Sequence, residues 1–245
     1  MSVRLTYSGR LGNHLLINWF GKIIAKKKSY YLYNSRIEGF LDTYSDIEGE
    51  KKELPLYQTS QYDCWNVLSK NLLGDVNGQI NVNTFLAEYK ELIPYKEYIR
   101  TSVVIENEEQ RTKPSKNDLV VHIRLGDYVG LNSSLSFETY YNIIKQETFD
   151  KCFLVTDDTS HNIVKRLVAE GCIIYHSSVI DDFVFLKNAN KIVISLSTFS
   201  WCAAFLSNAE KIYFPISENK WPFLKNPAKN EIDFRVFDEP RWVYV

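Results

Sequence analysis

The chain has 245 residues, 45% of them hydrophobic and 24% charged, so it can bury an ordinary core and is not a disordered or low-complexity protein. Its 29 Lys and Arg residues are balanced by 30 Asp and Glu residues, which gives a net charge of -1 and excludes a general electrostatic attraction to nucleic acid or an anionic membrane. The four cysteines include no Cys-x-x-Cys pair, which excludes zinc-ribbon and thioredoxin-like sites.

The first residues lead directly into a strand pattern, with neither a hydrophobic leader nor a run long enough to span a bilayer. We therefore expect a cytoplasmic protein without a transmembrane segment. Cys152 and Cys172 each begin an apolar strand-like run, and we expect both to be buried thiols. The composition does not predict the oligomeric state.

The first half of the chain predicts a small and irregular α/β domain. Apolar and polar residues alternate over residues 3–7, a turn with two glycines follows at 8–13, and helical spacing extends over 15–24. A second strand is expected at 30–33.

Beyond this strand the periodic signal weakens. Residues 40–79 follow no clean period and are expected to be irregular or mixed, and helical spacing returns at 85–93 and 98–104. Residues 106–117 are polar apart from one proline, which is typical of a linker between domains.

The expected domains span residues 1–112 and 113–245, and the second has the more regular pattern. Helices separate apolar strands there, which implies right-handed crossovers and a parallel, Rossmann-like sheet with helices on both faces. Ser178 to Asp181 has the pattern of a capping box for one helix. The predicted strands cover residues 119–123, 152–155, 172–175, 192–194 and 212–214, and the helices cover 137–146, 161–169, 182–188 and 199–207.

Polar residues follow three of these strands where each strand ends. Arg124, Gly126 and Asp127 follow the first strand, and Asp157 and Asp158 follow the second. The ends of parallel strands share one edge of the sheet, so we expect one ligand site there. An arginine that leaves a buried strand can hold two phosphate oxygens, and hydroxyl and N–H groups at a helix N-terminus also bind anions. The third set of polar residues follows the fourth strand and consists of the hydroxyl residues Ser195, Ser197, Thr198 and Ser200.

Each of these residues also has a purely structural interpretation. The alternative for Arg124 is a surface ion pair with Asp127, and the alternative for Asp157 and Asp158 is capping of the following helix. The serine and threonine cluster has the composition of an N-cap. His122 lies in an apolar strand and is by default a core histidine with a satisfied hydrogen bond.

Four separated motifs carry a resemblance to a known family. Residues 9–14 resemble the Gly-Arg-Leu-Gly-Asn-Gln motif, and residues 122–128 resemble the His-x-Arg-Arg-Gly-Asp-Tyr motif, of the α-1,2-fucosyltransferases of glycosyltransferase family 11. Residues 153–158 are similar to the family's Ser-Asp-Asp segment, and residues 195–204 to its Asn-Ser-Ser-Phe-Ser-Trp-Trp-Ala-Ala segment. The family is related to the α-1,6- and protein O-fucosyltransferases.

The resemblance implies a GT-B-like fold of two Rossmann-like halves, with an N-terminal acceptor-side domain and a C-terminal donor domain. It implies an inverting glycosyltransferase that moves fucose from GDP-fucose to the 2-hydroxyl of an acceptor sugar, with no cofactor and no metal. The partners would be a nucleotide-sugar and a glycan, and no nucleic acid. The expected donor-binding residues are Gly12, Asn13, His122, Arg124, Gly126, Asp157, Asp158, Ser197, Thr198, Phe199 and Ser200.

Arg124 is the leading catalytic candidate. Sugar transfer builds negative charge on the departing diphosphate, and without a metal an arginine fork must stabilise that charge. A general base must also take the acceptor proton. The candidates for this base are His14, Asp127 and Asp157.

Three features depart from the family pattern. Leu125 stands where the family usually has a second arginine, and His14 replaces a glutamine. Residues 40–78, where acceptor specificity is expected, match poorly. The missing arginine leaves open a binding protein that has lost turnover, and the fold leaves open a transferase that uses another nucleotide-sugar. The sequence does not identify the acceptor sugar.

Overall fold

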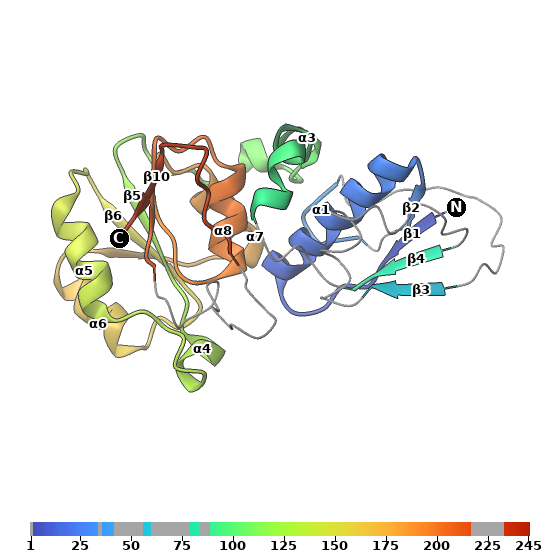
Figure 1. Ribbon diagram of the computed structural model, residues 1–245. Helices are drawn as coiled ribbons and strands as arrows, with labels where there is room; N and C mark the ends of the chain where they lie inside the picture. Colours follow the sequence, from blue (N-terminus) through green and yellow to red (C-terminus); the bar gives the residue numbers. More distant parts are fainter. Residues whose placement is uncertain (1, 34–35, 42–55, 60–78, 84–88, 217–232) are drawn as a thin grey trace. The chain divides into compact units, whose positions relative to one another are not determined.

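The computed structural model describes residues 2–33, 36–41, 56–59, 79–83, 89–216 and 233–245. The chain divides into two compact units, Met1–Glu106 and Asn107–Val245. Each unit contains its own parallel sheet (Figure 1), which confirms the predicted α/β class with two Rossmann-like halves. The assignment of the acceptor to one domain and the donor to the other stays a prediction.

The first unit has a four-stranded sheet in the order β2-β1-β4-β3, and all of its strand pairs are parallel. Helix α1, Leu11–Lys28, connects β1 to β2 and packs on β1 with buried apolar side chains such as Trp19. Gly21 allows this close packing, because a Cβ at that position would lie 2.2 Å from Leu5 Cδ2. The strands are β1 Ser2–Leu5, β2 Tyr31–Tyr33, β3 Leu56–Thr59 and β4 Gln79–Val82.

Two predictions for the first unit need correction. Helix α1 begins at Leu11, four residues earlier than predicted, so the expected turn at 8–13 is partly helical. The helix predicted over 85–93 is wrong where it is described, because Tyr89–Glu91 (η1) and Ile93–Tyr95 (η2) form 3-10 turns. Pro94 lies in η2. Because proline has no N–H group and its ring clashes with the preceding turn of a helix, no continuous helix runs through this segment.

Two further predictions for this unit concern the helix over 98–104 and the irregular region over 40–79. Helix α3, Lys96–Ser102, confirms the predicted helix over 98–104 except at its end, since Val103 is extended. Within the region predicted to be irregular, β3 is the described strand, whereas residues 42–55 and 60–78 lie outside the described part.

The second unit has a six-stranded sheet in the order β10-β9-β8-β5-β6-β7, with every strand pair parallel. From the central β5 the chain runs outward through β6 to β7, then returns to β8 on the other side of β5. The strand order therefore reverses between β5 and β8, which is where open α/β sheets bind ligands. The strands are β5 Leu119–Ile123, β6 Cys152–Thr156, β7 Ile173–Tyr175, β8 Lys191–Val193, β9 Lys211–Phe214 and β10 Trp242–Tyr244.

Helices cover both faces of this sheet, with α5 and α6 on one side and α7 and α8 on the other (Figure 1). Strand β5 is completely buried, as its unbroken apolar run predicts for a strand covered on both faces. The helices are α4 Gly126–Gly130, α5 Phe137–Gln146, α6 Asn162–Ala169, α7 Val179–Lys187 and α8 Thr198–Leu206, and a short 3-10 turn, η3, covers Glu108–Gln110.

The predicted strands and helices of this unit are confirmed to within three residues. The N-cap half of the predicted capping box is confirmed, because the Ser178 hydroxyl accepts a hydrogen bond from the Asp181 N–H at 3.1 Å. The prediction missed α4, a five-residue helix that begins and ends with glycine, and β10, a three-residue strand. Both elements are too short to show a period.

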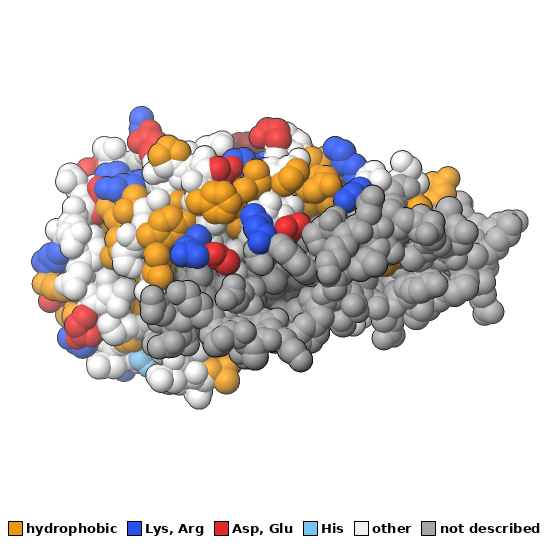
Figure 2. Space-filling model, in the orientation of Figure 1, with side chains coloured by type: hydrophobic (Ala, Val, Ile, Leu, Met, Phe, Trp, Pro, Cys, Tyr) orange, Lys and Arg blue, Asp and Glu red, His pale blue; other side chains and the backbone are white. Residues whose placement is uncertain are grey.

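Charged side chains of both signs are interspersed on the described surface shown in Figure 2, in agreement with the near-zero net charge. Within the part of the chain that the structure describes, no helix is both long enough and apolar enough to cross a membrane.

Candidate functional site

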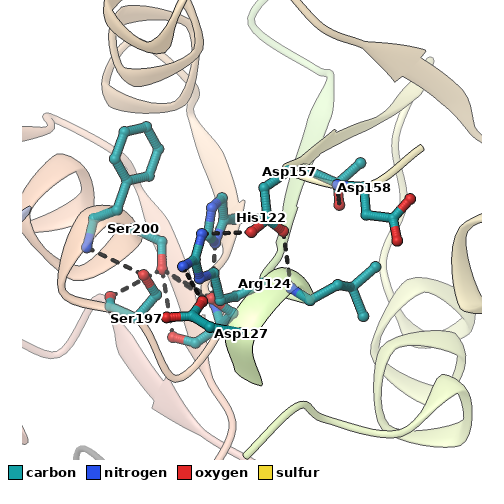
Figure 3. Close-up of polar contacts among 11 residues, drawn as sticks. His122, Arg124, Asp127, Asp157, Asp158, Ser197 and Ser200 are labelled. Carbon is teal, nitrogen blue, oxygen red and sulfur yellow. Dashed lines mark hydrogen bonds and ion pairs between the residues drawn. The ribbon is translucent and has the colours of Figure 1, made fainter. Parts of the chain in front are cut away.

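Arg124 lies directly after β5, at the point where the strand order reverses. Its side chain is only 11% exposed, and the guanidinium donates hydrogen bonds to Asp157 from the end of β6 and to Asp127 in α4 (Figure 3). The ring of Tyr128 lies 5.2 Å from the guanidinium carbon. Arg124 is thus held in one orientation by groups from two segments.

Asp157 holds the backbone after β5 as well as the arginine. One carboxylate oxygen accepts from Arg124, and the other accepts from the Leu125 N–H at 2.9 Å. Asp157 is 26% exposed, whereas Asp127 is 51% exposed. The pair with Asp127 is therefore the more readily exchanged of the two ion pairs, because water already reaches that carboxylate.

Asp158 makes different contacts. Its carboxylate accepts hydrogen bonds from the backbone N–H and the hydroxyl of Ser160, at 2.9 and 2.7 Å. These bonds lower the pKa of Asp158. They close the turn before α6 but do not cap the helix, because the N-cap is His161, whose Nδ1 accepts from the Ile163 N–H; the capping interpretation is therefore wrong for Asp158. A donor-binding role for Asp158 stays a prediction.

The hydroxyl groups after β8 form a buried cluster at the N-terminus of α8. The Ser197 side chain caps the helix by accepting from the Phe199 N–H at 3.3 Å. Ser200 is fully buried and donates to the backbone carbonyl groups of Ser195 and Ser197, at 3.4 and 3.2 Å. The N-cap interpretation is therefore correct for Ser197. The positive end of α8 still faces the region beyond the carboxyl end of the sheet.

His122 ties two of the strand ends together. Its Nδ1 lies 2.7 Å from the Ser195 hydroxyl, which links β5 to the segment after β8. Burial and the nearby Arg124 guanidinium lower the pKa of His122 to about 3, so the ring is neutral at physiological pH. It packs at 5.3 Å from the ring of Phe199. His122 has the contacts of a satisfied core histidine, and direct donor binding by it stays a prediction.

The predicted residues of the first unit lie at the start of α1. Gly12, Asn13 and His14 occupy its first turn. Gly9 has a φ of +79°, and a Cβ at this position would lie 2.4 Å from Asn13 Nδ2, so glycine is required where the chain turns into the helix. The His14 ring lies 5.2 Å from the ring of Tyr7.

Long-range contacts thus bring together the polar groups after three strands of the second unit. Arg124 connects β5 to β6 through Asp157, and His122 connects β5 to the residues after β8. The result is a rigid arginine at the switch point of a parallel sheet, beside a helix N-terminus, which is an arrangement suited to anions such as phosphate. No group of three or more His, Cys, Asp or Glu side chains that could hold a metal ion occurs among the described residues.

Comparison with known proteins identifies the family. The model for glycosyl transferase family 11 matches residues 107–245, which is more than half of the chain. The chain belongs to glycosyl transferase family 11. The match begins at the first residue of the second unit and includes every polar group around Arg124. No curated protein sequence matches the chain.

Solved fucosyltransferase structures share the fold of this family member. The α-1,6-fucosyltransferase NodZ from Bradyrhizobium, soaked with GDP-fucose, aligns with a TM-score of 0.57 at 13% identity over 86% of this chain and 93% of NodZ. POFUT1 in complex with GDP aligns with a TM-score of 0.56 at 11% identity, over 84% of this chain and 94% of POFUT1. A FUT1 variant from Arabidopsis thaliana, in complex with GDP, aligns with a TM-score of 0.52 at 12% identity, over 94% of this chain and 73% of FUT1.

Sequence reasoning missed two contributions to the site of this family 11 protein. The Leu125 N–H donates a hydrogen bond to Asp157, and the Tyr128 ring lies near the Arg124 guanidinium. A backbone N–H leaves no trace in the side-chain pattern. The tyrosine stands four residues after Arg124, in the short helix α4 that the sequence pattern did not reveal.

We expect Gly126→Ala to destabilise the turn that carries Arg124. Gly126 has a φ of +22°, and a Cβ there would lie 2.6 Å from Asp157 Oδ2. The expected loss is about 1 kcal/mol or more in the free energy of unfolding, measured by urea denaturation. Gly130→Ala, at the end of the same short helix, is the matched control, because a Cβ there meets nothing within 4 Å. Equal stability of the two variants would contradict the prediction.

Proposed function

We propose that the protein is an inverting, metal-independent fucosyltransferase, which moves fucose from GDP-fucose to the 2-hydroxyl of an acceptor sugar. The observation that carries the proposal is Arg124, a nearly buried arginine oriented at the switch point of a sheet whose sequence matches glycosyl transferase family 11. The structures of similar fold, with GDP-fucose or GDP in NodZ and GDP in POFUT1 and FUT1, support the choice of donor.

In this proposal Arg124 binds the donor diphosphate and stabilises the charge that grows on it as the sugar departs. Two N–H groups of the guanidinium face Asp157 and Asp127. A phosphate oxygen replaces the exposed Asp127 carboxylate, while the more buried Asp157 keeps the arginine aligned. Because the orientation of Arg124 is set before the donor arrives, little reorganisation accompanies the reaction.

The N-terminus of α8 is proposed to bind the same diphosphate. Its partial positive charge and the hydroxyl of Thr198 add stabilisation that needs no metal ion. Neutral His122 contributes no charge and holds the turn after β8 through Ser195. Gly12, Asn13, His14, Asp158 and Phe199 remain proposed contacts to donor or acceptor.

The general base for the acceptor hydroxyl remains to be chosen among His14, Asp127 and Asp157. Both oxygens of Asp157 accept hydrogen bonds, from Arg124 and from the Leu125 N–H. An acceptor hydroxyl would have to displace one of these hydrogen bonds to reach Asp157. Asp127 and His14 are therefore the stronger candidates.

Leu125 favours a second candidate function. Leu125 stands where the family pattern has a second arginine. Its side chain is completely buried and packs as an apolar group in the core. One positive charge near the diphosphate is missing, and a protein that binds a nucleotide-sugar without turnover is the alternative.

The decisive experiment is a calorimetric comparison of GDP-, UDP- and CDP-sugars, followed by donor-hydrolysis and transfer assays. We expect GDP-fucose to bind most tightly and its fucose to be transferred. Tight binding without hydrolysis or transfer to any of a panel of sugars would favour the alternative function. Preference for a UDP- or CDP-sugar would overturn the proposed donor.

A further inference from the structure

Two cysteines that are 20 residues apart in the sequence meet inside the second unit. The sulfur atoms of Cys152 and Cys172 lie 3.3 Å apart, within hydrogen-bonding distance for thiols. Both residues are buried, with exposures of 3% and 5%, and both are free thiols. Neither takes part in the site around Arg124, because Cys152 begins strand β6 whereas Asp157 follows its end.

The backbone positions suit a covalent link. Phe153 pairs with Ile173 at the start of the parallel β6–β7 ladder, and each cysteine stands one residue earlier. Neighbouring strands lie about 4.8 Å apart, which is within the Cα separation of about 4.4–6.8 Å that disulfides require. The two sulfur atoms already approach each other, so a bond needs only a small rotation of the side chains.

The environment favours reaction at this pair. A thiolate at Cys172 accepts a hydrogen bond from the Cys152 thiol, which lowers the pKa of Cys172 and raises that of Cys152. Strand β7 is an edge strand, and Ile173 and Ile174 are 44% and 38% exposed. A small oxidant can therefore reach the pair through local opening of the sheet edge, without unfolding of the central strands.

We propose that Cys152 and Cys172 form a reversible disulfide that fastens the edge strand β7 to β6 when the protein meets a hydroperoxide. The Cys172 thiolate attacks one peroxide oxygen, which breaks the O–O bond, gives a sulfenic acid and releases hydroxide that is protonated to water. Cys152, as its thiolate, then attacks the sulfenic sulfur and expels the second oxygen as water. In total, two thiols lose two electrons and two protons, and one hydrogen peroxide becomes two water molecules.

The bond closes a loop that contains helix α6 and removes freedom from the unfolded chain. It also joins β7 to the strand that immediately precedes Asp157, the carboxylate that orients Arg124. The inference does not depend on the proposed transferase activity, since it rests on the cysteine pair alone.

The test uses the full chain treated with hydrogen peroxide, then alkylated and digested with trypsin without reduction. Cys64, Cys152, Cys172 and Cys202 fall in four different tryptic peptides, because Lys or Arg residues separate them. We expect mass spectrometry to find the peptide of Cys152 joined to that of Cys172, and dithiothreitol to separate them. Free thiols at both positions, a sulfinic acid at Cys172 without a bridge, or a bridge to Cys64 would each overturn the proposal.

Thermal unfolding supplies a second measurement. Oxidation is expected to raise the midpoint temperature of the wild-type chain by several degrees and reduction to reverse the change. Cys202→Ser, which replaces a buried cysteine of α8, is the matched control and should show the same shift. Cys152→Ser should show none. A shift that persists in Cys152→Ser would contradict the assignment, and if that variant does not fold, the peptide map of the wild-type chain still decides.

Discussion

Arg124→Ala is expected to lower the kcat of fucose transfer from GDP-fucose by about 100-fold or more, since it removes a preorganised group that stabilises charge in the transition state. Arg124→Lys keeps the charge but loses the planar fork that contacts Asp127 and Asp157. We expect an intermediate loss for this variant, because lysine does not replace arginine at a bidentate site. Steady-state kinetics with calorimetric Kd values for GDP separates the loss of binding from the loss of catalysis.

The matched control for this experiment is Arg166→Ala. Arg166 lies in α6 with its side chain 47% exposed, and it pairs with Glu138 at 3.5 Å. Removal of such a surface ion pair changes little, so transfer should remain at the wild-type rate. Circular dichroism must show that Arg124→Ala remains folded. Near wild-type transfer by a folded Arg124→Ala variant would remove Arg124 from the mechanism.

Glu147→Ala is expected to cause the largest loss of stability, with little effect on transfer. The Glu147 side chain is only 8% exposed and accepts hydrogen bonds from Lys191, Lys211 and Tyr213, at 3.1, 2.8 and 2.6 Å. Lys191 begins β8, and Lys211 and Tyr213 lie in β9. The network is therefore near the amino-terminal ends of the strands, whereas Arg124 follows a carboxyl-terminal end. We expect a loss of about 2–3 kcal/mol, below the value for a fully buried pair because Lys211 is 42% exposed.

The same carboxylate predicts how stability depends on pH. Burial alone would raise the pKa of Glu147, but the hydrogen bonds from Lys211 and Tyr213 outweigh burial and lower the pKa to about 2. Because the pKa is lower in the folded state, this contribution to stability is complete above about pH 4.5 and disappears as the pH falls towards 2. Glu147→Gln should therefore flatten the acid side of the stability curve.

Urea denaturation between pH 2 and 7 measures this effect. Glu170→Gln is the matched control, because Glu170 is 41% exposed and lies 3.7 Å from Lys145. That variant should follow the wild-type curve. If Glu147→Gln also follows the wild-type curve, the network does not stabilise the fold.

The sequence predicts the second unit better than the first for a physical reason. Most of its strands are largely buried and appear as apolar runs such as β5, and amphipathic helices such as α5 separate them. In the first unit, helical spacing extends to Ile93, but the described end of this segment forms the 3-10 turns η1 and η2 next to Pro94, which a helix interior does not tolerate. Apolar spacing shows which face is buried, but it does not show whether the backbone can form the hydrogen bonds.

The candidate site divides in the same way. Position at a strand end identified Arg124, Asp127, Asp157 and the hydroxyl cluster, because parallel strands bring their carboxyl ends to one edge. The different roles of Asp157 and Asp158 came from the structure alone. Asp157 contacts a residue 33 positions away, whereas Asp158 contacts Ser160 in its own turn. Adjacent aspartates look equivalent in a sequence because their partners are set by tertiary packing.

The sequence by itself determined the class of the fold, and it predicted the edge of the sheet for the candidate site and Arg124 as its central residue. These features follow from local periodicity and from residue types at strand ends. Only the tertiary structure decided that Asp157 orients this arginine, that His122 is neutral and bonded to Ser195, and that Cys152 meets Cys172. Such pairs depend on strand order and register, which arise from the packing of segments that are distant in the chain.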